Sequence, residues 1–203
     1  MKYFTILIVM MFSTTALFSQ NPYKMEVGDQ LVYHVETETA DYDFTVIPTK
    51  LSQTGIVFEY KMGEPTNLQG VISISADALK NATAMYNKFA GGNVNLTDQI
   101  SVFASQAMMN SASEGMGLIS TDGSAGNAED FTTLAGNTSP TNNSTYMKMV
   151  KNINGTDFIL DGPIMENEDG AKTVRFADGG GYPFITYMKI DFKIYLKEII
   201  RKK

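Results

Sequence analysis

The stretch FITYMKIDFKIYL, from Phe184 to Leu196, decides which fold the sequence predicts. Its residues alternate between two faces with the period of two that a β-strand shows when one face is buried. The more apolar face consists of Phe184, Thr186, Met188, Ile190, Phe192, Ile194 and Leu196. A single strand of about 13 residues is much longer than usual and requires pronounced twist, so the stretch predicts the wall of a curved sheet or barrel.

Shorter segments of the chain show the same alternation or a similar β-branched composition. They are 30–38, 42–46, 56–62, 71–76, 146–153, 158–160 and 173–177. The first two should form a hairpin, and Pro48 should end the second because proline has no backbone N–H for a neighbouring strand. The predicted fold class is mainly β (α+β), a curved antiparallel sheet or half-barrel of about eight strands with two inserted helices.

The pattern changes between residues 77 and 110, where apolar residues recur at the spacings of three and four that define a helical face. A first helix should begin near Ser75 or Asp77 and end near Gly91. A second helix should begin after Thr97 as its N-cap. Its apolar stripe consists of Ile100, Phe103, Ala104, Ala107 and Met108.

The next part of the chain, 110–145, is rich in Asn, Ser, Thr and Gly and shows no sustained apolar period. We expect a flexible polar loop, either a functional lid or a neutral insertion. Short apolar islands at 116–119 and 131–134 indicate that the loop touches the folded body in places. Residues 20–203 should thus form a single β-rich domain with a helical insertion at 77–110.

Residues 1–19 have the order of a signal peptide, which predicts export. Lys2 supplies the basic start, an apolar run from Phe4 to Phe12 follows, and the bond after Ser19 is the expected cleavage site. A membrane anchor is the alternative, but it would need roughly 20 apolar residues, more than this segment contains. We therefore expect a protein of the periplasm, or of the cell surface or extracellular space, with no stable membrane span.

The composition argues against several functional classes. The 203 residues include 16 Lys and Arg against 22 Asp and Glu, and the charge of -6 argues against nucleic acid, which binds basic surfaces. The chain has no Cys and one His, which removes disulfides, thiol nucleophiles and metal sites rich in Cys or His. We expect no metal, no cofactor and no enzymatic activity, although an enzyme that uses carboxylates or Tyr stays open.

Two local patterns allow both a chemical and a simpler interpretation. His34, Glu36 and Glu38 project from one face of a predicted strand, where they could form a metal or acid–base site or simply face solvent. The glycines after Asp178 could cradle a phosphate, but Pro183 and a strand follow them instead of a helix. A connection between two strands is the simpler interpretation of these glycines.

Four strands, a helical insertion and a closing set of strands resemble, in their architecture, the exported half-barrel proteins typified by the periplasmic lipoprotein carriers. The resemblance covers residues 28–198 and includes no diagnostic motif. It implies that an acyl chain or a similar apolar group binds between a curved sheet and the helices. No binding residue of that family can be transferred, because no position matches a family signature.

The leading hypothesis is an exported, noncatalytic binding or carrier module for an apolar or amphipathic ligand such as a lipid. Apolar side chains of the predicted helix and strand are the candidate binding residues: Phe103, Met108, Phe184, Met188 and Phe192. The chain has 13 Met residues, and Met adapts to irregular apolar ligands but also fills gaps in a core. The alternative is an envelope structural or protein-interaction domain with no small-molecule ligand. An internal cavity would favour the carrier, and a fully packed core the alternative.

Overall fold

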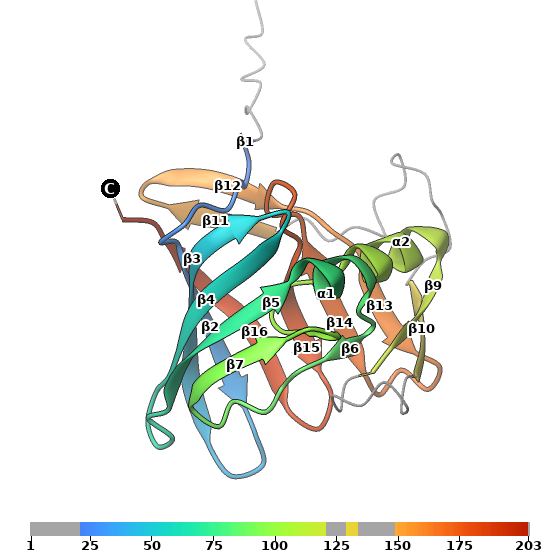
Figure 1. The fold of residues 1–203 in the computed structure, drawn as a ribbon, viewed down its shortest axis with the longest axis horizontal. Coiled ribbons are helices and arrows are strands. Elements are labelled where there is room, and N and C mark those ends of the chain that lie inside the picture. The colour runs from blue at the N-terminus through green and yellow to red at the C-terminus, as the bar shows by residue number, and fades with distance from the viewer. Residues whose placement is uncertain (1–20, 121–128, 134–148, 203) are drawn as a thin grey trace, which may run out of the picture.

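A large mixed β-sheet dominates the structure, a computed structural model that describes residues 21–120, 129–133 and 149–202. Within these residues eleven strands follow one another in the order β7 (Gly92–Leu96), β5 (Gln69–Ser75), β4 (Gly55–Met62), β3 (Asp41–Ser52), β2 (Gln30–Glu36), β16 (Lys193–Ile200), β15 (Phe184–Lys189), β14 (Thr173–Ala177), β13 (Ile164–Asn167), β10 (Glu129–Thr133) and β9 (Met116–Ile119). Figure 1 shows the sheet twisting and curving around the segment that carries the helices α1 (Ala76–Asn81) and α2 (Gln106–Glu114).

The sheet confirms the mainly β fold class and corrects its details. It has more strands than the eight expected, and it is mixed because β7 runs parallel to β5. The chain between these two strands includes α1, and a parallel neighbour requires such a crossover connection. In the described part of the chain the end strands β7 and β9 do not pair with each other, so the sheet is open.

Two smaller sheets complete the described strands. β1 (Asn21–Pro22), β12 (Thr156–Leu160) and β11 (Met149–Ile153) form one of them, with β1 parallel to β12. β6 (Ala84–Met85) and β8 (Gln99–Ile100) form a short parallel pair. Met85 and Ile100 are buried, so this pair packs into the core and brings the segment between α1 and α2 against the large sheet.

The segment 110–145, predicted as a flexible polar loop, contains regular structure where it is described. α2 extends to Glu114, and β9 pairs with β10 in antiparallel orientation. The apolar islands explain this, because Ile119 and Phe131 are buried in the core. Residues 121–128 and 134–148 lie outside the described residues, as does the predicted signal peptide, 1–19.

The predicted 13-residue strand is wrong, because this stretch forms the hairpin of β15 and β16. The strands pair antiparallel across a loop in which the Ile190 N–H donates to the Phe192 carbonyl oxygen at 2.8 Å. Met188 pairs directly with Ile194 across that loop, so the two side chains share a face. The alternation therefore continues unbroken through the turn, and alternation alone does not separate one long strand from a hairpin with a loop of three residues.

The prediction that Pro48 ends its strand is also wrong. β3 continues to Ser52, and its pairing with β4 shifts by one residue at Thr49, which forms a bulge. The Pro48 carbonyl oxygen accepts a hydrogen bond from the Gly28 N–H at 2.8 Å. Bulges are among the few places where a sheet tolerates proline, because the ladder is interrupted there in any case.

α1 begins at the predicted place and ends early. The Ser75 side chain caps it, but the helix stops at Asn81 and the chain from Ala82 is extended. The Met85 and Tyr86 N–H groups find acceptors outside any helix, at distances of 2.8 and 2.7 Å, on residues of distant segments. These tertiary hydrogen bonds override the helical spacing of the apolar residues, which an isolated segment would follow.

α2 begins at Ser105 instead of the predicted Thr97. The buried Ser105 Oγ accepts a hydrogen bond from the Met108 N–H at 3.0 Å and donates one to the Ala82 carbonyl oxygen. Gly115 ends the helix in a left-handed conformation, with φ 95°. Among the described residues, no helix has the length and apolar character to cross a membrane.

Replacing Ser105 by Ala should lower the free energy of unfolding by about 1–3 kcal/mol. The substitution removes the N-cap of α2 and leaves the buried Ala82 carbonyl oxygen without its donor. Chemical denaturation followed by circular dichroism measures the loss. Ser113→Ala is the matched control, because Ser113 is exposed in the same helix, and it should cost less than about 0.5 kcal/mol. Equal losses in the two variants would contradict the capping role.

Candidate functional site

A pocket of about 270 Å³ lies between the inner face of the sheet and the segment that carries β6 and β8. Part of its floor is a row of direct cross-strand partners: Tyr42 on β3, Val35 on β2, Ile194 on β16 and Met188 on β15. Directly opposed residues of neighbouring strands point to the same face, so the register gathers these side chains side by side. Val35 and Met188 are buried, whereas Tyr42 and Ile194 are half-buried.

A second row of partners continues the floor. Met62, Phe44 and Tyr33 are paired across β4, β3 and β2. The Phe44 and Tyr33 rings lie 6.1 Å apart, and the buried Tyr33 hydroxyl donates a hydrogen bond to the Ile185 carbonyl oxygen at 2.9 Å. The floor is therefore held by ring packing and by a hydrogen bond to a further strand of the sheet.

The segment after β6 forms the opposite wall. The Phe89 ring lies 4.7 Å from the Phe44 ring and 5.0 Å from the Tyr60 ring. The Tyr86 ring packs 5.9 Å from Phe89, and the Gly91 N–H donates to the Tyr60 hydroxyl oxygen at 2.9 Å. Aromatic packing and one hydrogen bond thus fasten this wall to the sheet.

The lining is apolar and aromatic with few polar groups. None of the described residues that line the pocket carries a charge. The polar groups come from Thr37, Tyr42, Tyr86, Asn87, Ser101 and Tyr33. Such a composition, mostly apolar with a few neutral polar groups, is typical of sites for small apolar or amphipathic molecules.

Ser101 and Val102 form the most strained part of the wall. Val102 has φ 63°, a left-handed conformation that β-branched residues rarely adopt. The turn is closed by a hydrogen bond from the Phe103 N–H to the Ser101 carbonyl oxygen at 2.6 Å. Strain of this kind costs about 1–3 kcal/mol and is concentrated at functional sites. The Val102 carbonyl oxygen accepts a hydrogen bond from the Ile185 N–H at 2.7 Å, which fixes the turn against the sheet.

The side-chain hydroxyl of Ser101 is in an unusual environment. The residue is 1% exposed, and among the described residues its Oγ has no hydrogen-bond partner. Buried polar groups are nearly always hydrogen-bonded, so each exception requires an explanation. Ser101 belongs to the residues that line the pocket, but its Oγ has almost no accessible surface there.

The structure brings two of the five predicted site residues into the pocket. Met188 and Phe192 line it, at the end of the β15–β16 hairpin. Phe103, Met108 and Phe184 are buried in the core outside the lining, where Phe103 and Phe184 face each other through an isolated bridge.

A bulge explains why Ile185 lines the pocket although the alternation places it on the other face. The register between β14 and β15 shifts at this point and leaves Thr186 without a direct partner. One extra residue exchanges the faces on its two sides. Ile185 and Met188, three residues apart, therefore share the pocket.

Sequence reasoning also missed Tyr33, Phe44 and Ser101. The alternation in 30–38 and 42–46 already places Tyr33 and Phe44 on the face of Leu31 and Val46, so a closer comparison of that hairpin would have found them. For Ser101 the sequence offers no signal, because an unpartnered hydroxyl becomes visible only when the surroundings of the side chain are known.

Burial raises the pKa of the Tyr33 hydroxyl above its usual value near 10. A raised pKa in the folded state contributes stability that is fully present below the unfolded pKa and is lost as the pH rises through and beyond it. We therefore expect the free energy of unfolding, measured by urea denaturation, to fall between about pH 9 and pH 11. Tyr33→Phe should make that fall smaller. If the free energy of unfolding of Tyr33→Phe fell with pH as steeply as that of the unchanged protein, the contribution assigned to Tyr33 would be contradicted.

The outer face of the sheet carries the possible metal or acid–base site considered from the sequence, which consists of His34, Glu36 and Glu38. His34 Nδ1 is 3.1 Å from Asp43 Oδ1, and Lys197 Nζ is 2.8 Å from Asp43 Oδ2. Hydrogen bonds from Lys197 and His34 hold the pKa of the Asp43 carboxyl below its usual value. Glu36 pairs with a lysine of β16 and Glu38 is exposed. In the part of the chain that the structure describes, no group of three or more His, Cys, Asp or Glu is placed to hold a metal ion.

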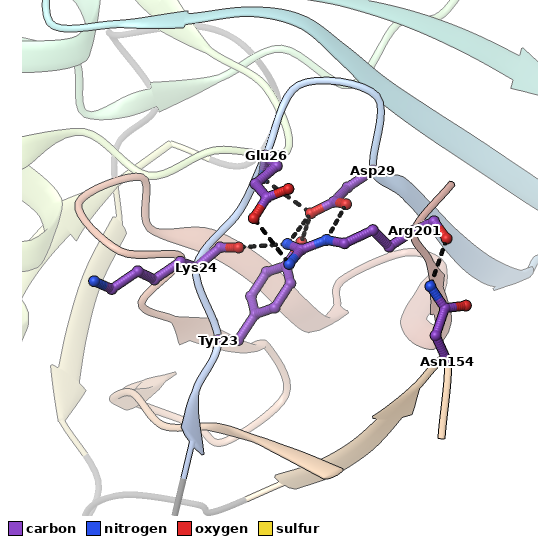
Figure 2. Close-up of polar contacts among 6 residues, drawn as sticks. All are labelled: Tyr23, Lys24, Glu26, Asp29, Asn154 and Arg201. Carbon is purple, nitrogen blue, oxygen red and sulfur yellow. Dashed lines mark hydrogen bonds and ion pairs between the residues drawn. The ribbon is translucent and has the colours of Figure 1, made fainter. Parts of the chain in front are cut away.

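A cluster of charges joins the C-terminal end of the chain to the segment before β2 (Figure 2). Arg201 binds Asp29 in two-pronged geometry, with Nε 2.8 Å from Oδ1 and Nη2 2.7 Å from Oδ2. The Tyr23 hydroxyl and the Glu26 N–H also donate to Asp29 Oδ2, at 2.7 and 2.9 Å. The guanidinium reaches the Glu26 carboxylate as well, at 3.0 Å, and the Lys24 carbonyl oxygen at 2.6 Å.

This cluster is a structural clasp between the two chain segments. Asp29 is 1% exposed, and burial alone would disfavour its charged form. The hydrogen bonds from Arg201, Tyr23 and Glu26 outweigh burial and hold the pKa of Asp29 below its usual value. The carboxylate of Asp29 thus ties Arg201 to the segment that carries Tyr23 and Glu26.

A second hollow, of about 440 Å³, lies between α1, α2 and the loop before β15. Its lining includes Gln53, Lys80 and Gln106, so it is more polar than the first pocket. The glycines after Asp178 lie in the adjoining loop and connect β14 to β15, as the simpler interpretation of the sequence predicts. The first pocket is therefore the better candidate for an apolar ligand.

No protein-family model, curated protein or solved structure matches the chain. The resemblance to half-barrel carriers therefore stays an expectation from the sequence.

Proposed function

We propose that the protein is an exported, noncatalytic binding or carrier module for a small apolar or amphipathic ligand held in the inner pocket. The observation that carries the proposal is the uncharged, largely aromatic cavity of about 270 Å³ on the inner face of the sheet. Concave pockets lined mainly by apolar and aromatic side chains, with a few polar groups, are the usual form of a small-molecule site. The cavity is slightly smaller than most ligand pockets, which span roughly 300–1,000 Å³, and so suits a compact molecule or a single acyl chain.

The chemistry of the lining supports binding over catalysis. General acid–base catalysis needs a group whose pKa lies near the working pH. The titratable groups of the described lining are tyrosines, and burial raises the pKa of Tyr33, Tyr42 and Tyr86 further from neutrality. These hydroxyls are suited to orient a ligand by hydrogen bonding.

Export is part of the proposal and rests on the signal-peptide pattern of residues 1–19. A carrier in the periplasm or at the cell surface would meet lipids and other apolar molecules of the envelope. The half-barrel architecture expected from the sequence supports the same role. Intact-mass measurement of protein recovered from the envelope should show that residues 1–19 have been removed, and an uncut N-terminus would contradict export.

Native mass spectrometry tests the ligand directly. Protein purified without detergent, and again after incubation with an envelope lipid extract, should carry a discrete excess mass that disappears on denaturation. Extraction would then identify the bound molecule. A bare mass in both preparations would overturn the carrier proposal and favour the alternative, an envelope structural or protein-interaction domain with no small-molecule ligand.

A further inference from the structure

We propose that the segment 86–91 is a gate over the inner pocket, which moves away from the sheet to admit the ligand and closes again on Tyr60. The inference rests on the proposed function and adds to it the way in which the ligand enters. Three observations carry it: the position of the segment on the pocket, the few contacts that hold it there, and the glycines at its end. Figure 1 shows the segment within the connection that runs from β6 to β7.

The gate covers part of the buried floor of the pocket. Tyr86, Asn87 and Phe89 line the pocket from this side and are half-buried. The Phe89 ring packs on the ring of Phe44, a floor residue that is 2% exposed, with 4.7 Å between the two centroids. Movement of Phe89 away from the sheet would therefore uncover Phe44 and widen the pocket at this point.

Few contacts hold the gate against the sheet. At its start the Tyr86 N–H donates to a carbonyl oxygen of β8 at 2.7 Å, and at its end the Gly91 N–H donates to the Tyr60 hydroxyl oxygen at 2.9 Å. No backbone–backbone hydrogen bond joins residues 88–90 to another described residue. The Phe89 ring, 5.0 Å from that of Tyr60, holds this middle part. A segment with so few main-chain hydrogen bonds can open without unfolding the domain.

Two glycines allow the gate to turn while the chain on both sides stays fixed. Gly91 and Gly92 have φ of 87° and 76°, a left-handed conformation that glycine adopts without a steric penalty. Beyond them the chain is held, because Gly92 pairs with Gly70 in the ladder of β7 and β5. Before the gate the Met85 N–H donates to the Ser120 carbonyl oxygen at 2.8 Å. Motion is thus confined to the segment between, and a glycine hinge absorbs it.

Tyr60 is the latch of this gate, the residue that holds it closed. It is 1% exposed and does not line the pocket, yet its hydroxyl and its ring both contact the gate. Tyr60→Phe removes the hydrogen bond to Gly91 and keeps the ring. The closed form is then weakened to the same degree whether the pocket is empty or occupied. The ligand should therefore enter and leave faster by the same factor, while its affinity stays unchanged.

Stopped-flow fluorescence with the neutral fluorophore N-phenyl-1-naphthylamine measures both rates, with excess octanol displacing the fluorophore for the dissociation rate. In Tyr60→Phe both rates should rise by about twofold to tenfold, as expected for one lost hydrogen bond, and the dissociation constant should stay within about twofold. Tyr23→Phe is the matched control, because it also removes a hydrogen bond of a buried tyrosine hydroxyl, but in the clasp at Asp29. It should leave both rates unchanged.

Hydrogen exchange gives a readout that does not depend on a ligand. The amide of Gly91 should exchange through opening of the gate, at least about tenfold faster than the amides of β4, which is paired with β3 and β5 on its two sides. Exchange of Gly91 as slow as that of β4 would show that the segment opens only when the fold does, which would overturn the inference.

The outcomes separate this inference from the proposed function. If neither N-phenyl-1-naphthylamine nor octanol binds, the proposed function fails and the inference fails with it. If they bind but Tyr60→Phe leaves both rates unchanged, or raises the dissociation rate alone so that the affinity falls, the segment is a fixed wall. The inference then fails while the binding function stands.

Discussion

Replacing Arg201 by Met should lower the free energy of unfolding by about 3–5 kcal/mol. Methionine keeps much of the length of the side chain and removes its charge. The Asp29 carboxylate, 1% exposed, would then stay buried without the two-pronged partner that neutralises it. Breaking one side of a buried ion pair is costly because the other charge remains away from water. Urea denaturation of the variant and the unchanged protein measures the difference.

Lys197→Met is the matched control for this substitution. It also removes a C-terminal cation, but the side chains of Lys197 and its partner Asp43 are 50% and 44% exposed. Solvent-exposed pairs contribute little, so the control should lose much less stability than Arg201→Met. Similar losses in the two variants would contradict the role given to burial at Asp29.

The pH dependence gives the first prediction a second test. The lowered pKa of Asp29 means that its contribution is present above its unfolded pKa of about 4 and is lost as the pH falls below it. In Arg201→Met the buried carboxyl should prefer its neutral form, so acid removes less stability from the variant. The gap in stability between the two proteins should therefore narrow as the pH falls toward about 3. A gap that stays constant with pH would point to lost packing around the arginine stem instead of lost charge.

This clasp also shows a limit of sequence reasoning. Asp29 and Arg201 lie at opposite ends of the folded domain's sequence, and nothing in their neighbourhoods marks them as partners. Their pairing follows from the position of β16 beside β2, which joins the end of the chain to its beginning. Local patterns predict strands well because strand burial repeats every second residue, but they do not state which strands become neighbours.

Some pocket residues can be predicted from the local sequence pattern, whereas others depend on which strands become neighbours. Met188 and Phe192 could be predicted because the alternation of the last stretch survives the hairpin turn. The bulge at Thr186 could not, since a one-residue shift in register depends on pairing with β14. The helical spacing of 77–110 misled for a related reason, because β6 and β8 find partners in distant segments that outweigh local propensity.

Ile194→Trp should abolish retention of the ligand in native mass spectrometry and weaken octanol binding by at least about tenfold. Ile194 is half-buried in the floor of the pocket, directly paired with Val35 and Met188, so a larger side chain at this position extends into the pocket. The chain has no native Trp, and the introduced indole therefore reports its own surroundings by fluorescence. Its emission should be that of a sheltered ring, and added octanol should change it little.

Tyr195→Trp is the control for this substitution, because Tyr195 is the next residue of β16 and faces the opposite side of the sheet. Its ring lies 5.3 Å from that of His34, away from the pocket lining, so octanol binding should stay within about twofold of the unchanged protein. Weakening by both substitutions would assign the effect to distortion of β16 instead of occupancy of the pocket.

The stability of Ile194→Trp distinguishes an available pocket from a packed core. Forcing extra atoms into a filled interior usually costs about 1–3 kcal/mol, because neighbouring side chains must leave their preferred conformations. An indole that enters a pocket of about 270 Å³ displaces solvent or ligand and buries its own apolar surface, so the loss should stay below about 1 kcal/mol. A stable variant that has lost the ligand would show that the space exists to be occupied. A strongly destabilised variant would show that the space is not available, which would remove the observation on which the proposed function rests.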